Sequence, residues 1–74
     1  MKPLPKPPAA WPGADGKPVS CSEKLKMLAE NHAEAATMLR DVFEDAVLMG
    51  VDEAAMRGIL NDMIAALPSP KRGA

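Results

Sequence analysis

The chain has one cysteine, one histidine, no tyrosine, one tryptophan and one phenylalanine among its 74 residues. A single cysteine excludes an internal disulfide, and a single histidine argues against a structural zinc site. No apolar run is long enough to cross a bilayer, and Met1 leads into lysine and prolines rather than into a secretory signal. We therefore expect a soluble cytoplasmic protein that has no membrane partner, no metal and no cofactor.

Motifs for catalysis are missing as well. The five glycines are scattered and do not form a loop that could cradle a phosphate. The only histidine, His32, lies about three helical turns after Ser20, which is beyond hydrogen-bond reach for activating a serine nucleophile. We expect no enzymatic activity. The frequent alanine, proline and arginine suggest a GC-rich bacterial genome.

The short chain limits the size of any core. A proline-rich stretch occupies residues 1–19, so only residues 20–67 are left to build a packed domain. Cores of this size bury too little apolar surface to offset the entropy of the chain. Because disulfides and metals are excluded, association with a protein partner or a second copy is the remaining way to gain stability.

Charge is unevenly distributed. The net charge is −1, but residues 1–19 carry +2, residues 20–67 carry −5, and the basic tail at 68–74 carries +2. Nucleic-acid phosphates need a positive face, so the acidic body argues against a DNA or RNA partner. The basic ends are instead suited to acidic helices, either of this chain or of a partner.

The first 19 residues are expected to form an extended arm. Prolines fix φ and remove backbone donors, which prevents a helix or a central strand, and Pro12-Gly13 and Asp15-Gly16 predict turns. The proline spacing weakly matches a polyproline ligand. Either the arm is a mobile tail or it docks, and Trp11 favours docking because a lone large ring is rarely left in solvent.

A long first helix is predicted at 21–49. Ser20 and Glu23 match a capping box, and apolar residues recur at spacings of three and four from Leu25 to Met49. Gly50 is expected to end the helix in a left-handed conformation. At 1.5 Å per residue, the helix should be about 42 Å long.

A shorter second helix is predicted at 53–67. Asp52 is its expected N-cap and Pro68 its end, and its apolar face carries Met56, Ile59, Leu60, Met63, Ile64 and Leu67. The link between the helices is too short for any arrangement except antiparallel neighbours. The expected fold class is therefore all-α: a two-helix hairpin with an extended N-terminal arm, completed into a helical bundle by association.

The second helix is only about half as long as the first, so it cannot cover the first turns of the long helix. Three coverings are possible: the arm folds back, a second copy packs there, or a different protein does. We favour association, because a folded-back arm still leaves a small core. The predicted partner-binding residues are Trp11, Leu25, Leu28, His32, Leu39 and Phe43.

These features predict a small non-catalytic accessory or regulatory subunit that binds a larger protein or itself. The alternative is a small metal- or thiol-dependent redox protein that uses Cys21 and His32. Cys21 falls at the start of a helix, where the dipole lowers the pKa of a thiol. However, no resolving cysteine or neighbouring histidine accompanies it. An inert cysteine and a packed histidine are the simpler interpretations.

Overall fold

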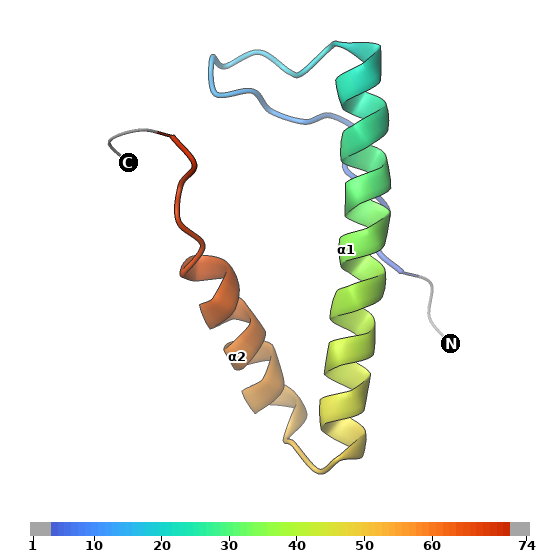
Figure 1. Ribbon diagram of the computed structural model, residues 1–74, viewed down its shortest axis with the longest axis vertical. Coiled ribbons are helices and arrows are strands. Elements are labelled where there is room, and N and C mark those ends of the chain that lie inside the picture. Colours follow the sequence, from blue (N-terminus) through green and yellow to red (C-terminus); the bar gives the residue numbers. More distant parts are fainter. Residues whose placement is uncertain (1–3, 72–74) are drawn as a thin grey trace. The chain divides into compact units, whose positions relative to one another are not determined.

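The computed structural model describes residues 4–71, and these residues contain two α-helices and no named strand. Helix α1 is Ser22–Leu48 and helix α2 is Glu53–Ala65. Figure 1 shows the two helices joined by a short link, with a loop preceding α1. The predicted all-helical hairpin is confirmed. The structure does not test whether the hairpin completes a bundle by association.

The chain divides into two compact units, Met1–Asp41 and Val42–Ala74, and α1 runs through the boundary between them. The first unit holds the N-terminal loop and the larger part of α1. The second unit holds the last turns of α1, the link and α2. Each unit is described separately below.

In the first unit, a tight loop precedes α1. The Trp11 carbonyl accepts a 2.8 Å hydrogen bond from the Val19 amide, and Pro12 and Pro18 form an isolated antiparallel bridge. Gly13 closes the loop because its amide bonds to the Lys17 carbonyl, and a Cβ at this position would collide with that same oxygen. The chain therefore reverses once, at residues 13–16, and Pro12 lies in the bridge rather than in a separate turn as predicted.

The expected Asp15-Gly16 turn is present within this loop. Gly16 has φ +85° and donates to the Gly13 carbonyl at 3.1 Å. The Asp15 carboxylate accepts the Lys17 amide at 2.9 Å, which is the side-chain-to-backbone bond typical of aspartate in turns. Glycine suits the positive φ because it has no Cβ to clash with the backbone.

Helix α1 begins later than the capping-box prediction. Its first residue is Ser22, and the Cys21 carbonyl accepts the first helical bond, from the Leu25 amide at 2.9 Å. Cys21 is therefore the N-cap, and the predicted cap, Ser20, makes no hydrogen bond with Glu23 among the described residues. The Cys21 sulfur accepts hydrogen bonds from the backbone amides of Lys24 and Glu23, which are the amides that the side chain of an N-cap residue satisfies.

The end of α1 agrees with the prediction for Gly50. This glycine has φ +107°, its amide bonds to the Val47 carbonyl at 3.0 Å, and the Val51 amide bonds to the Ala46 carbonyl at 2.9 Å. Together these two bonds form a Schellman motif, which satisfies carbonyls that the helix end leaves free. The motif reverses the chain and directs it into α2.

Helix α2 starts at the predicted residue. Asp52 has extended backbone angles (φ −60°, ψ 136°), and its carboxylate accepts the Ala55 amide at 2.9 Å. The helix ends at Ala65 rather than at the predicted Leu67. Pro68 accounts for the earlier end, because a proline disfavours helical angles in the residue before it.

Candidate functional site

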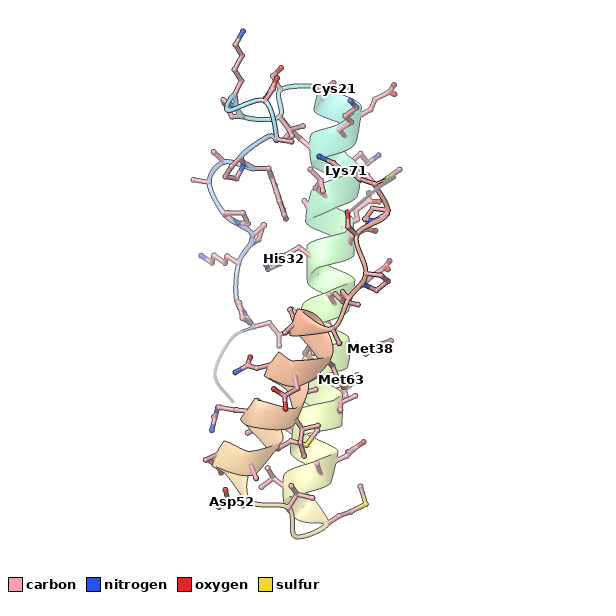
Figure 2. The ribbon with its side chains drawn as sticks, turned by 90° about the vertical axis from the view of Figure 1, so that its left-hand side faces the viewer. Cys21, His32, Met38, Asp52, Met63 and Lys71 are labelled. Carbon is pink, nitrogen blue, oxygen red and sulfur yellow. The ribbon has the colours of Figure 1, made fainter. Side chains whose placement is uncertain are left out.

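Trp11 contacts His32 on α1. The two rings meet edge to face, with centroids 6.1 Å apart and planes at 77°, and both residues are half-buried. In Figure 2, His32 extends from α1 on the side of the N-terminal segment. Edge-to-face packing is favourable because the positive edge of one ring meets the negative face of the other. Trp11 is therefore seated against the helix rather than left in solvent.

The contact leaves one polar atom of His32 without a partner. Its Nδ1 is buried and makes no hydrogen bond with the described residues. The residues one turn away on α1 (Leu28, Ala29, Ala35 and Ala36) are all apolar, so the helix face offers no acceptor. His32 thus serves here as a ring that packs against tryptophan, and the structure brings no ligand group to it.

The six predicted partner-binding residues differ in how far they are covered. Trp11, Leu25, Leu28, His32 and Phe43 are half-buried, whereas Leu39 is exposed. The structure brings Trp11 and His32 into contact, and it leaves Leu39 as the one open position of the set. The chain itself therefore covers part of the surface that the sequence predicted to be free for a partner.

In the second unit, Arg57 holds α2 against the end of α1. Its guanidinium carbon lies 4.6 Å from the centre of the Phe43 ring, and its Nη1 lies 3.7 Å from Glu53 Oε2. A cation over an aromatic face contributes about 0.5–1 kcal/mol at an exposed site. The contact thus joins the two helices, while the ion pair with Glu53 stays within α2.

An open groove of about 270 Å³ lies beside this contact. Its lining residues are Phe43, Glu44, Val47, Leu48 and Glu53. We call it the elbow groove, because Leu48 ends α1 and Glu53 begins α2. Its floor is apolar and it carries two carboxylates, of which Glu53 already has Arg57 as a partner. Glu44 forms no ion pair within the part of the chain that the structure describes.

The largest feature missed at the sequence level is the extent of exposed apolar surface. Met56 is the only described residue that is buried, with 8% of its surface exposed. Eleven large apolar side chains of the described residues are exposed: Met27, Met38, Leu39, Val42, Leu48, Met49, Val51, Ile59, Met63, Ile64 and Leu67. The helical periodicity of the predicted second helix did place four of them on its apolar face: Ile59, Met63, Ile64 and Leu67. Periodicity could not show that these four side chains stay exposed.

Cys21 is exposed at the N-terminus of α1. Hydrogen bonds from the backbone amides of Lys24 and Glu23 lower the pKa of its thiol, and the nearby Lys24 charge acts in the same direction. An open hollow of about 250 Å³ lies beside it, bordered by Lys17 and the Gly13 loop. This arrangement favours the thiolate, which is the nucleophilic form of cysteine.

Metal ligands are not gathered anywhere in residues 4–71: no group of three or more His, Cys, Asp or Glu side chains could hold an ion. Within the same residues, neither helix has the length and apolar character needed to cross a membrane. No protein-family model, curated protein or solved structure significantly matches this chain.

Proposed function

We propose that this protein is a small non-catalytic accessory or regulatory subunit, which binds a larger protein or a copy of itself through its apolar helix surfaces. One observation carries the proposal: a single residue is buried among the described residues, while eleven large apolar side chains are exposed. Isolated apolar side chains on a protein surface are ordinary. A chain that exposes many more large apolar side chains than it buries is typical of a protein that is completed by a partner.

The exposed side chains of α2 offer the clearest contact surface. Ile59 and Met63 are four residues apart and therefore lie on one side of the helix, and they are 49% and 61% exposed. Methionine suits such a surface because its flexible, polarizable side chain adapts to a partner. Burying side chains of this size contributes about 1.5–3 kcal/mol each when they are fully covered.

Affinity capture with a matched pair of variants tests the proposal. The tagged full chain should recover a discrete partner from the native extract, or else a second copy of itself. Met63→Glu should abolish recovery, because it places a charge in the apolar contact. Asn61→Glu adds the same charge at an exposed polar position of the same helix and should leave recovery unchanged. Equal recovery by both variants would contradict the proposal.

A thiol-dependent function is the second candidate, because the pKa of Cys21 is lowered and its sulfur is exposed. Cys21→Ser keeps a side chain that can cap the helix but removes the thiol. If binding depends on the thiol, this variant loses its partner and retains its helicity by circular dichroism. If Cys21 only caps the helix, partner recovery is the same with serine, and the thiol-dependent function is rejected.

A further inference from the structure

The elbow groove presents apolar surface at the end of α1. Phe43 and Val47 lie four residues apart on α1 and are half-buried, and Leu48 beside them is 85% exposed. The groove holds about 270 Å³ and is open, whereas pockets for small molecules are concave and measure about 300–1,000 Å³. It therefore suits a single large side chain of a partner protein better than it suits a small molecule.

The charge around this groove is negative. Two of its five lining residues are the carboxylates Glu44 and Glu53, and none of the five is basic. In the sequence, residues 42–66 contain five acidic residues and one basic residue, so this stretch carries −4. A surface of this sign attracts partners that carry Lys or Arg and repels acidic ones.

The cations closest to the groove in the sequence have other partners. Arg57 lies over the Phe43 ring and pairs with Glu53, and Arg40 pairs with Asp41 at 3.2 Å. Arg57 also shows which contacts this part of the hairpin makes with a cation, since its guanidinium lies against an aromatic ring and near a carboxylate. The second carboxylate of the groove has no such partner within the described residues.

That second carboxylate, Glu44, lies near the helix end that disfavours negative charge. Asp45 begins the last turn of α1, Glu44 comes directly before it, and this last turn contains no basic residue. The C-terminal end of a helix carries a partial negative charge, so cations stabilise this end and carboxylates oppose it. Positions that break a local rule in this way, with no compensation within the chain, are expected at functional sites. A cation from a partner would supply the compensation.

We propose that the elbow groove binds a segment of a partner protein in which a large apolar side chain lies next to a lysine or arginine. The apolar side chain packs against Phe43, Val47 and Leu48. The cation pairs with Glu44. This inference rests on the proposed binding function and states the chemistry of the partner at one site, which does not include the α2 side chains that the capture experiment tests.

Binding of a labelled peptide to the full chain, measured by fluorescence anisotropy, tests the inference. The probe is an amphipathic helical peptide of about 14 residues made of leucine and lysine, with its leucines on one side. One control peptide has serine in place of leucine, and the other has glutamate in place of lysine. The leucine–lysine peptide should bind, and its affinity should fall as salt is added, because salt screens the charges. Each control peptide should bind at least about tenfold more weakly.

Matched variants locate the binding. Glu44→Lys opposes the cation and Leu48→Ala removes apolar contact, so each should raise the dissociation constant of the leucine–lysine peptide about tenfold. Asp62→Lys makes the same charge reversal outside the groove, and Ile64→Ala removes an exposed apolar side chain outside it. These two controls should change the constant by no more than about twofold at physiological salt. All four side chains are exposed, and circular dichroism verifies that the helices persist.

Two results would show a general attraction to an acidic chain and would overturn the inference: equal weakening by Glu44→Lys and Asp62→Lys, or equal binding of the serine–lysine peptide. Two others would assign the groove to the chain itself and would overturn it as well. One is a wild-type dimer in sedimentation equilibrium that Leu48→Ala dissociates. The other is peptide binding that becomes about tenfold tighter in Lys71→Ala, because the basic tail then competes for the groove.

None of these results contradicts the proposed binding function. The Met63→Glu capture experiment tests that function separately, on a side chain of α2 that does not line the groove.

Discussion

Replacing Trp11 by alanine tests whether the N-terminal loop is held by its ring. The ring is half-buried against His32. An aromatic side chain buries roughly 150–250 Å² when fully covered, so partial cover corresponds to roughly 100–170 Å². At about 25 cal/mol per Å² this is about 2.5–4 kcal/mol, and compact unfolded states reduce the figure. We therefore expect Trp11→Ala to cost about 2 kcal/mol in the free energy of docking the loop.

The native emission of the protein reports this contact directly, because Trp11 is the only tryptophan. Its fluorescence should be blue-shifted in native buffer and should move to the solvent-exposed wavelength in urea. Trp11→Ala should lose loop protection in hydrogen exchange at the Val19 amide, which bonds to the carbonyl of residue 11. Helix content should survive, since the cap of α1 and all of α2 are unchanged.

Two variants make this experiment specific. Trp11→Phe keeps an aromatic ring and should retain most of the docking energy, whereas Lys17→Ala alters an exposed side chain of the same loop and should have no effect. Emission already at the exposed wavelength in native buffer would refute the reasoning. Full protection of the Val19 amide in Trp11→Ala would refute it as well.

Three further outcomes follow from the helix ends. Gly50→Ala should cost about 1–2 kcal/mol in urea unfolding followed by circular dichroism, because φ +107° is strained for any residue with a Cβ; an unchanged midpoint would contradict this. Asp52→Ala should cost about 1 kcal/mol by the same measurement, with Asp52→Asn as a near-neutral control that keeps an accepting oxygen. The rate of Cys21 alkylation should reach half its maximum at a pH below that of a free cysteine, because amide bonds from Lys24 and Glu23 stabilise the thiolate. Because the folded state favours the thiolate, the folded state should become more stable as the pH rises through the pKa of the Cys21 thiol. An alkylation profile like that of a free cysteine would contradict both the lowered pKa and this stability trend.

The ends of the helices could be predicted from the sequence where they depend on capping residues close by in the chain. Asp52 caps α2 and Gly50 ends α1, because each position is decided by hydrogen bonds to residues within a turn or so. The prediction of Ser20 as the cap of α1 was wrong by one residue, because Cys21 takes that position. The loop bond from Val19 to Trp11 joins residues eight apart, and no helical pattern reports such a bond. Cysteine is also an uncommon N-cap, so its role at position 21 carried no sequence signal.

Side-chain exposure was less predictable than helix position. Periodicity placed Met63 and Ile64 on an apolar face, but burial depends on what lies opposite each residue, and both remain exposed. The contact between Trp11 and His32 was one of three coverings left open, because sequence spacing cannot choose among them. Likewise, the position of Arg57 over Phe43 depends on how the hairpin closes, which its residue type does not specify.

The short sequence separation of these contacts has a consequence for how the chain folds. Trp11 and His32 are 21 residues apart, and Phe43 and Arg57 are 14 apart. Closing loops of this length takes well under a microsecond to a few microseconds, and helices of this size form on a similar timescale. Proteins with such low contact order fold in microseconds to milliseconds. The two contacts also close within separate units, so neither has to wait for the other. Newly synthesised chains should therefore reach this hairpin quickly, and under the proposed binding function the encounter with a partner, rather than folding, should limit the rate of assembly.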